Sequence, residues 1–505
     1  MKQKIAVFLF LIFSAALLAF SIRGNVGNPI YYQSERDTRV GGPFESTNSN
    51  ARYALTESIV KYGTVFLNPD LAQFSSPDVV EFKGKYFSIF TPGISFVGIP
   101  FYALGQQFNS PQLTTYLATT LFAVFNLYLV YKIARRLGGN TIASLLAGFT
   151  FIFATNALSY AHTLTQHHMS VTAILLGVLF ATNKKNLINA IGFGAVFGMG
   201  ALFDVPNVIM MAPLGLYMLF SYFSLQTVQN KIKLSIKASV MGLLIGVIPF
   251  IMLFGWYNHT TSGSYTLLAQ SIGRPTGLST APDLKSIKKT QTQTKSDASF
   301  KLPFETRAQM NGSYILLLSN ERAWIFYSPI VLLGVFGIFL AFRKTDSKTL
   351  AGLVASVIIV NVSIYTMFGD PWGGWSFGPR YLIPSAALLS ASIGIILTRY
   401  NRNFIVIPVF LALFAYSAFI SSTGALTTNA IPPKVEAVNL PTPIPYTYEY
   451  SFQMLEKNQM SSLMYNLYFP NMLTAWSYTY IYSGVIIAAG ISLLTINYFQ
   501  KPVKK

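Results

Sequence analysis

Long apolar segments alternate with polar segments from one end of the chain to the other. Apolar runs of roughly 20 residues are long enough to cross the hydrocarbon core of a bilayer as helices. The pattern predicts an all-α polytopic membrane protein with about twelve transmembrane helices. They lie over Ile5–Phe20, Thr114–Ile133, Ile142–Tyr160, Met169–Thr182, Leu187–Leu202, Asn207–Phe223, Ala238–Trp256, Phe326–Phe342, Leu350–Met367, Tyr381–Leu397, Phe404–Ile420 and Tyr478–Tyr498.

Composition supports a membrane protein. The chain is 52% hydrophobic and 10% charged, whereas soluble domains have about a quarter of their residues charged. A large soluble protein is excluded because too few polar residues are available to cover its surface. Because the chain has no cysteine, disulfides, thiolate metal sites and a thiol nucleophile are also excluded.

The net charge of +19 would suggest a nucleic-acid partner in a soluble protein. Here Lys and Arg gather in the short polar segments between alternate helices, for example at Arg135-Arg136 and Lys184-Lys185. This distribution follows the positive-inside rule and predicts that both termini are cytoplasmic, with no role for nucleic acid. It holds only if Tyr86–Gln107 does not cross the membrane. Pro92-Gly93 and Pro100 disfavour a continuous helix there, so we predict a juxtamembrane segment.

The remaining polar segments are then extracytoplasmic. We interpret residues 1–505 as one domain, with a large first outside loop over residues 24–112 that bears juxtamembrane helices. Further long outside loops cover residues 257–324 and 421–476, and short ones lie at Ala161–His168, Asp204 and Gly369–Arg380. Because the outside segments are long and the inside ones short, we expect the chemistry on the extracytoplasmic side.

Four regions, in order along the chain, carry a family resemblance, and the first of them contains two motifs. The first loop contains Thr47–Leu55 (TNSNARYAL) and Gly84–Gly93 (GKYFSIFTPG). Trp256–Asn258, Ser319–Pro329 (SNERAWIFYSP) and Gly373–Leu382 (GGWSFGPRYL) follow. Together they resemble the GT-C membrane glycosyltransferases, in particular the protein O-mannosyltransferase-like and aminoarabinose-transferase-like branch.

The resemblance implies a GT-C-like fold and a transferase that uses a polyprenyl-phosphate sugar, such as a dolichyl-phosphate one. The acceptor would be a protein, lipid or glycan on the extracytoplasmic face. Such a reaction uses a carboxylate to take the acceptor's proton and cationic donors to stabilise the leaving phosphate. No cofactor is firmly implied.

The chain departs from the family at Ser49, where an acidic residue is common. The nearest upstream acid is Glu45, which we take as the first candidate for the base, followed by Asp78 and Asp37. Glu45 is alternatively an acid that stabilises a helix N-terminus. If no acid of this loop reaches the site, the protein is an inactive relative.

Arginines at the predicted outer boundary are candidates for phosphate binding, because a guanidinium fork binds phosphate through two hydrogen bonds. Arg380 and Arg52 come first, with their neighbours Tyr381 and Tyr53, and Arg322 is a third candidate. Each arginine alternatively snorkels to the interface or forms a structural ion pair.

Three of the four histidines, His162, His167 and His168, share one short outside loop. Imidazoles suit metal ions, but this loop has no carboxylate, so we assign no metal and favour a substrate contact or a structural role. Asp204 follows one predicted span and precedes Pro206. It contacts the substrate or caps the next helix.

Two other functions remain open. A polytopic transporter or flippase would also have many spans, but the predicted spans carry few charges of the kind that line ion paths, and no inverted repeat is visible. A non-catalytic component of envelope assembly is the third alternative, suggested by Ser49.

Overall fold

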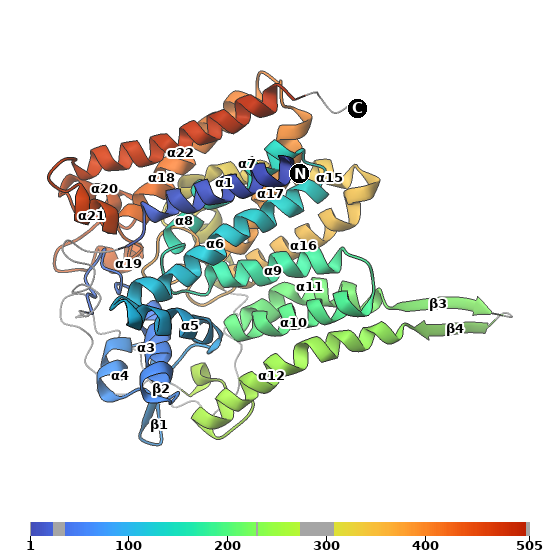
Figure 1. Cartoon of the computed structure of the whole chain (residues 1–505), viewed down its shortest axis with the longest axis horizontal. Coiled ribbons are helices and arrows are strands. Elements are labelled where there is room, and N and C mark those ends of the chain that lie inside the picture. The colour runs from blue at the N-terminus through green and yellow to red at the C-terminus, as the bar shows by residue number, and fades with distance from the viewer. Residues whose placement is uncertain (1, 24–35, 229–230, 273–307, 501–505) are drawn as a thin grey trace.

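The computed structural model describes residues 2–23, 36–228, 231–272 and 308–500, so parts of the predicted outside loops 24–112 and 257–324 lie outside the described residues. The described chain is mostly helical (Figure 1). Helices occupy every segment predicted to span the membrane. They are α1 (Lys2–Ala19), α6 (Pro111–Arg136), α7 (Thr141–Phe153) with α8 (Ala157–Tyr160), α9 (His167–Ala181), α10 (Leu187–Phe203), α11 (Pro206–Phe220), α12 (Met241–Ser262), α14 (Trp324–Tyr327) with α15 (Leu333–Phe342), α16 (Lys348–Thr366), α17 (Ile383–Arg399), α18 (Val406–Leu426) and α22 (Ala475–Tyr498).

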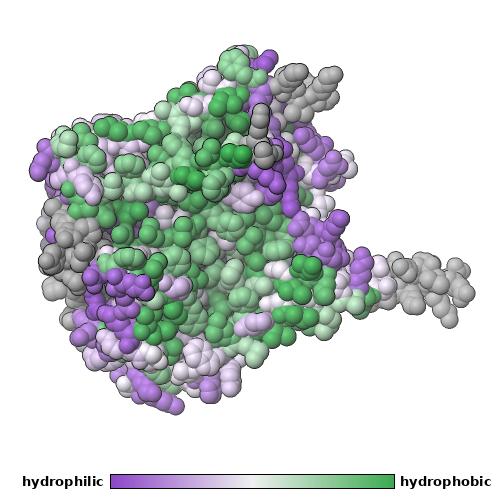
Figure 2. Space-filling view, viewed as in Figure 1, coloured by the Kyte–Doolittle hydropathy of each residue, from purple (hydrophilic) through white to green (hydrophobic). Residues whose placement is uncertain are grey.

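Among the described residues, six helices are long and apolar enough to cross a membrane, and six shorter apolar helices accompany them. Figure 2 shows hydrophobic residues over the middle of the molecule and hydrophilic residues gathered toward its two ends. An apolar girdle of this kind is what a bilayer requires of an embedded surface. The chain is therefore an integral membrane protein, while the number of crossings stays a prediction.

The two ends of the bundle differ. Figure 1 shows both termini at one end and the helices of the first and last loops at the other. The latter are α3 (Thr47–Tyr62), α4 (Pro69–Ser75), α5 (Gly93–Gln107), α19 (Lys434–Ala437), α20 (Glu449–Glu456) and α21 (Leu463–Tyr468). Segments that the charge pattern assigns to one side of the membrane thus lie together.

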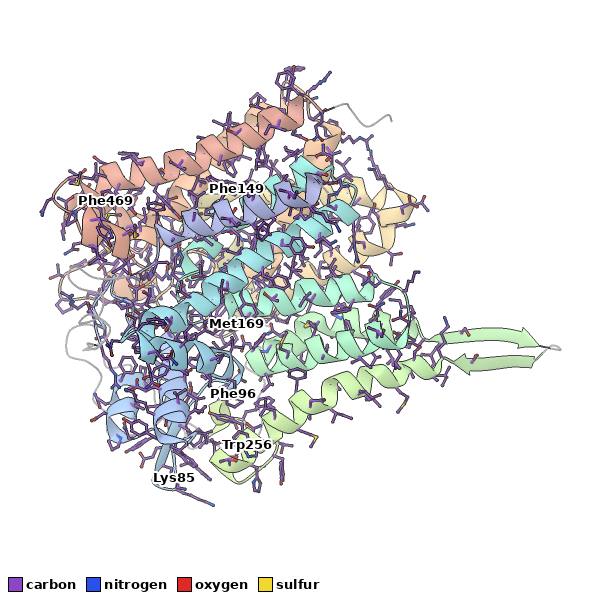
Figure 3. All side chains as sticks on the ribbon, viewed as in Figure 1. Lys85, Phe96, Phe149, Met169, Trp256 and Phe469 are labelled. Atoms are coloured by element: carbon purple, nitrogen blue, oxygen red, sulfur yellow. The ribbon has the colours of Figure 1, made fainter. Side chains whose placement is uncertain are left out.

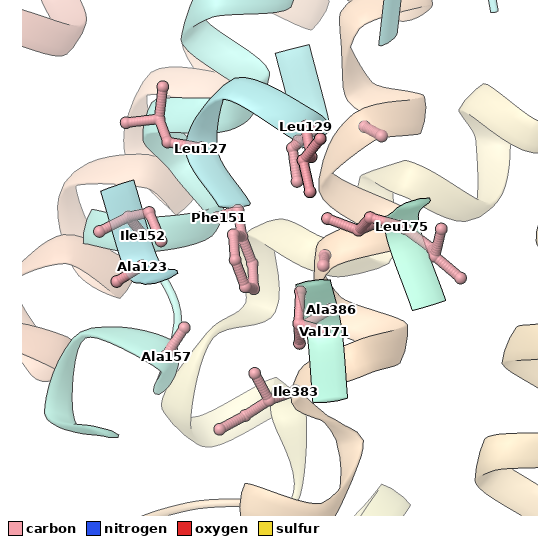
Figure 4. Close-up of a cluster of buried hydrophobic side chains, with 14 of the residues drawn as sticks. Ala123, Leu127, Leu129, Phe151, Ile152, Ala157, Val171, Leu175, Ile383 and Ala386 are labelled. Atoms are coloured by element: carbon pink, nitrogen blue, oxygen red, sulfur yellow. The ribbon is translucent and has the colours of Figure 1, made fainter. Parts of the chain in front are cut away.

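Helix α17 is the centre of the bundle. Its apolar stretch is 94% buried, whereas that of α12 is only 11% buried. Side chains of α17 pack against those of α6, α7 and α9. Figure 4 shows one side chain from each of these helices: Leu127, Phe151, Val171 and Ile383. A central helix of this kind fixes the direction of the residues that precede it, which include Arg380.

Small residues let α12 attach to the outside of the bundle. It packs against α10 through Gly242 and Gly246, which face Gly194 and its neighbours. A Cβ at Gly246 would lie 2.1 Å from the carbonyl oxygen of Ile191. Glycines spaced four apart allow helix backbones to approach closely in membranes, where lipid removes the hydrophobic drive for association.

We therefore expect Gly246→Ala to destabilise the protein by about 1–3 kcal/mol, because the added methyl group has no space beside α10. The apparent thermal midpoint in detergent should fall. Gly484→Ala in α22 is the matched control, since a Cβ there meets nothing within 4 Å. Equal midpoints for the two variants would contradict the close packing of α10 and α12.

Two hairpins correct the all-α prediction. Strands β1 (Val79–Phe82) and β2 (Lys85–Ser88) pair within the first loop, joined by Lys83 and Gly84 at positive φ, 51° and 72°. A two-residue turn of this kind suits the twist of paired strands. Strands β3 (Phe223–Val228) and β4 (Lys231–Ile236) form a second hairpin in a predicted basic loop. Both were missed because four to six residues of alternation are too short to stand out beside long apolar runs.

Candidate functional site

Four segments far apart in sequence meet at one end of the bundle. They are α3, the turn 161–166 before α9, the end of α10 and the loop 369–380 before α17. The first loop reaches α10 through Thr91, whose Oγ1 donates to the carbonyl of Phe203 at 3.0 Å. Gly93 permits the contact, because a Cβ there would lie 2.5 Å from the carbonyl oxygen of Leu202. All four segments were predicted to be extracytoplasmic.

Arg52 projects from the first half of α3 and is buried. Its Nη1 donates to the carbonyl of Asn48 at 3.0 Å, its Nη2 donates to Gln166 Oε1 at 3.0 Å, and its guanidinium lies 3.9 Å from the ring centre of Phe90. Burial lowers the pKa of Arg52 to about 10, although Asp204 and Asp78 act to raise it. Its Nε has no partner in the structure, so this buried cation has a donor to offer.

Arg380 lies in the turn that precedes α17 and is near enough to Arg52 for the two charges to interact. Its guanidinium lies 5.4 Å from the ring centre of Tyr381, which stacks on Tyr365 at 4.4 Å. Gly373 has φ +72°, and a Cβ there would lie 2.7 Å from Arg380 Nε, so only glycine leaves room for the guanidinium. Arg380 Nε also lacks a hydrogen-bond partner.

Asp204 follows the C-terminal end of α10, is half-buried, and lies near enough to both arginines for their charges to lower its pKa. Gln166 lies near both groups, because its side chain accepts from Arg52 Nη2 at 3.0 Å and its proximity lowers the pKa of Asp204. Burial raises the pKa of Asp204 to about 6, and Arg52, Gln166 and Arg380 act in the opposite direction. The carboxyl group therefore titrates near neutral pH.

The three histidines of the 161–168 segment separate in the fold. His162 contacts Ser21 Oγ at 2.9 Å and Thr120 Oγ1 at 3.2 Å, and His168 Nε2 contacts the carbonyl of Ala157 at 2.8 Å, so both join helices to one another. His167 instead faces Arg52 and Arg380. Its ring packs edge-on against Tyr160, and its Nε2 is buried without a partner. His167 alone of the three therefore belongs to the polar site.

Glu45, the first candidate for the base, has a carboxylate enclosed by donors. Arg23 Nη1 and the backbone N–H of Asn429 contact Oε1, while Thr428 Oγ1 and the backbone N–H of Gly41 contact Oε2. The side chains of Arg23 and Glu45 are 1% and 2% exposed. Since each oxygen already accepts two hydrogen bonds, the geometry argues against Glu45 as a base.

The other two candidate acids differ from each other. Asp37 accepts from Arg39 Nε at 2.9 Å and Nη2 at 2.8 Å, which is a local surface ion pair. Asp78 accepts from Thr47 Oγ1 at 2.7 Å and is one of the acids that act on Arg52. Asp78 thus adjoins the site, whereas Asp37 is occupied by its neighbour.

Arg322 is fully buried, and its nitrogens donate to backbone carbonyls. Nε donates to Trp372 at 3.1 Å, Nη1 to Glu321 at 2.7 Å, and Nη2 to Ile431 at 2.9 Å. It therefore holds the loop 372–376 that leads to Arg380. Tyr53 is buried among the aromatic rings of Phe44, Tyr102 and Tyr116 and serves the core.

Sequence reasoning missed three residues of the site: Gln166, Tyr365 and Asp370. Asp370 faces Arg380 and lies in the outside segment 369–380. Gln166 directly precedes the two adjacent histidines. Only Tyr365 had no signal, because an aromatic residue at a helix end is common in a membrane protein. Within the described residues, no three His, Asp or Glu side chains gather in a way that would hold a metal ion.

An apolar groove of about 500 Å³ lies on the flank of the same end, lined by Ile59, Val65, Phe96, Ile99, Leu253 and Trp256. Figure 3 shows Phe96 and Trp256, which come from α5 and α12. Two helices that line the groove also contact each other near Arg52, because Ser95 of α5 donates its Oγ–H to the backbone carbonyl of Arg52 in α3 at 2.9 Å. An apolar recess therefore flanks the helix that carries a buried cation.

Comparisons with known proteins agree with this architecture. Residues 101–254 match the family described as dolichyl-phosphate-mannose-protein mannosyltransferase. The structure resembles ArnT from Cupriavidus metallidurans bound to undecaprenyl phosphate, with TM-score 0.51, 14% identity, and coverage of 97% of this chain and 77% of that one. The apo form of ArnT gives TM-score 0.49 at 14% identity, covering 99% and 78%.

The archaeal oligosaccharyltransferase AglB from Archaeoglobus fulgidus, in complex with an inhibitory peptide and a dolichol-phosphate, gives TM-score 0.41 at 11% identity. The match covers 100% of this chain and 57% of that one. A sequence search of curated proteins gives no significant match.

The fold and site define a polytopic, helical membrane protein with a polar centre at one end of the bundle. More particularly, the fold resembles that of ArnT, and residues 101–254 match the mannosyltransferase family, so the resemblance stated from the ordered sequence motifs is confirmed.

Proposed function

We propose that the protein transfers a sugar from a polyprenyl-phosphate donor to a protein, lipid or glycan acceptor at the extracytoplasmic face, with about twelve spans and both termini in the cytoplasm. The observation that carries this proposal is the convergence of three unpartnered, buried nitrogens: Arg52 Nε, Arg380 Nε and His167 Nε2. Buried polar groups are nearly always hydrogen-bonded in the working state. An anionic ligand is the partner that two guanidinium groups select.

Phosphate fits this site because it is the group on which negative charge grows during transfer. When the bond between the sugar and the phosphate breaks, the lipid phosphate gains one charge. Arg52 and Arg380 then stabilise that charge more strongly than they stabilise the donor, which is the condition for catalysis. Their burial strengthens the interaction, since little water screens it.

Two observations favour a lipid-linked donor. The apolar groove beside α3 offers a surface for a polyprenyl chain, next to the helix that carries Arg52. The fold also resembles that of ArnT, which was solved with undecaprenyl phosphate. Arg52, Tyr381 and Asp204 surround the sugar in this proposal, whereas Arg322 acts through the loop that it holds.

Binding of undecaprenyl phosphate to the purified protein in nanodiscs tests the proposal. Arg380→Ala should weaken binding roughly 10- to 100-fold, because a hydrogen bond to a charged group contributes about 1.5–3 kcal/mol. Arg343→Ala, which removes an exposed arginine after α15, is the control and should bind as wild type does. Equal binding by wild type, Arg380→Ala and Arg343→Ala would contradict the role of Arg380 in phosphate binding. Absence of sugar transfer from labelled polyprenyl-phosphate sugars would contradict the proposed function.

A further inference from the structure

The acceptor must lose a proton during transfer, and Ser49 stands where relatives often have an acid. The acids of the first loop are largely occupied. Glu45 accepts four hydrogen bonds. Glu57 pairs with Arg36 and Lys61 at 3.0 Å each. Asp78 adjoins the site and accepts from Thr47 Oγ1 at 2.7 Å, which leaves it as the first-loop alternative. The other carboxylate that adjoins Arg52 lies on a different segment.

We propose that Asp204 is the general base that takes the proton of the acceptor. This inference rests on the proposed function, because it assigns a role within that same transfer. Asp204 comes from the end of a membrane helix and not from the first loop, so the base and the Arg52 side chain reach the site from different parts of the chain.

The placement of Asp204 carries the inference. It is half-buried, and it faces both Arg52 and Arg380, the two cations assigned to the phosphate. The acceptor and the leaving phosphate both bond to the same anomeric carbon, so a base near the phosphate-binding cations also lies near the reacting carbon. Gln166, which Arg52 holds by a hydrogen bond of 3.0 Å, lies beside the carboxylate and favours its charged form.

The neighbours of Asp204 also suit the task. The Tyr365 and Tyr381 rings lie close enough to interact with its charge, and they provide an aromatic wall against which a sugar can pack. Asp370 is the other carboxylate near Arg380, but it acts on Arg380 and Arg322 and not on Arg52. Asp204 is therefore better placed, near both cations.

The step balances as follows. The Asp204 carboxylate accepts the proton of an acceptor O–H or N–H. The acceptor atom forms the new bond to the anomeric carbon of the sugar, and the bond from that carbon to the phosphate oxygen breaks. The oxygen keeps the electron pair, so polyprenyl phosphate leaves with one more negative charge, and protonated Asp204 later releases its proton to water.

A pH dependence follows with a definite sign. With a pKa of about 6, Asp204 is protonated below that pH and cannot act as a base, so kcat/KM should fall about tenfold per pH unit there. The charged groups facing it are Arg52 and Arg380. Asp204→Glu should keep the acid limb but move it, because the longer side chain changes the distances to both arginines.

The experiment measures transfer from radiolabelled dolichyl-phosphate mannose and undecaprenyl-phosphate mannose to a detergent extract of the host membranes. Binding of undecaprenyl phosphate is measured alongside as the test of folding and of the phosphate site. Asp204→Asn should retain binding and lose transfer about 10²- to 10⁴-fold, as expected for the loss of a general base. Asp346→Asn, which changes an exposed carboxylate in the turn between α15 and α16, is the matched control and should keep the activity of the wild type.

Two results would overturn the assignment. Equal transfer by Asp204→Asn and wild type would remove the role of Asp204 and leave the proposed function standing, as would an acid limb that does not move in Asp204→Glu. Absence of transfer by the wild-type protein from either donor would overturn both the role of Asp204 and the proposed function.

Discussion

Replacement of Arg52 by lysine should abolish measurable sugar transfer although the positive charge is kept. The guanidinium contacts the carbonyl of Asn48, Gln166 Oε1 and the ring of Phe90 at once, and an ammonium group cannot make these contacts together. Loss of one preorganised donor to a developing negative charge costs about 10²–10³ in kcat. Release of Gln166 should add to this loss, because Gln166 favours the charged form of Asp204.

The readout that identifies Arg52 is the pH profile. Arg52 lowers the pKa of Asp204, in opposition to burial. Arg52→Ala should therefore raise that pKa and move the acid limb of any residual activity to higher pH. Arg39→Ala is a control in the same loop, since the Arg39 side chain is 74% exposed and pairs with Asp37 at the surface. Unchanged transfer by Arg52→Lys would contradict the role of Arg52.

The helices of this protein could be predicted from sequence because each one is a local feature. An apolar run such as Tyr478–Tyr498 needs no information from the rest of the chain to identify it as a helix. The charge pattern also assigns Arg52, His167, Asp204 and Arg380 to the same side of the membrane, and the structure brings them together at one end of the bundle.

The pairing of side chains within that end could not be predicted. His162, His167 and His168 are near neighbours in sequence, yet only His167 faces the arginines, because the turn before α9 directs the other two toward Ser21 and Ala157. Gln166 gains its role only when α3 comes within 3.0 Å of it. Such contacts depend on tertiary packing, which a single sequence does not reveal.

The choice of Glu45 shows the same limit. In sequence, Glu45 is the upstream acid nearest to Ser49, the position at which relatives often carry an acid. The sequence favours it as the base for that reason. In the structure its partners are Arg23, which precedes the loop, and Thr428 and Asn429, which follow α18. We therefore expect this carboxylate to join the three segments and not to transfer a proton, and no local pattern in the sequence distinguishes the two uses.

Glu45→Gln should therefore be among the most destabilising substitutions in the protein, and the loss should be one of stability, not of chemistry. Removal of one partner from a buried ion pair costs about 3–5 kcal/mol, because the other charge stays buried without compensation. Arg23 is 2% exposed, and its Nε and Nη2 already lack partners. The amide of glutamine would also turn N–H groups toward the donors of Gly41 or Asn429.

A double variant separates the structural role from the catalytic one. Arg23→Met with Glu45→Met removes both charges, so it should recover much of the stability lost by Glu45→Gln alone, as replacement of buried ion pairs by apolar residues often does. Apparent thermal midpoints and transfer per mole of folded protein are measured for the wild type, for Glu45→Gln, for Arg23→Met and Glu45→Met separately, and for the double variant. A catalytic Glu45 would leave the double variant folded but inactive; a structural Glu45 restores stability and transfer together, which is the outcome that the four donors around its carboxylate lead us to expect.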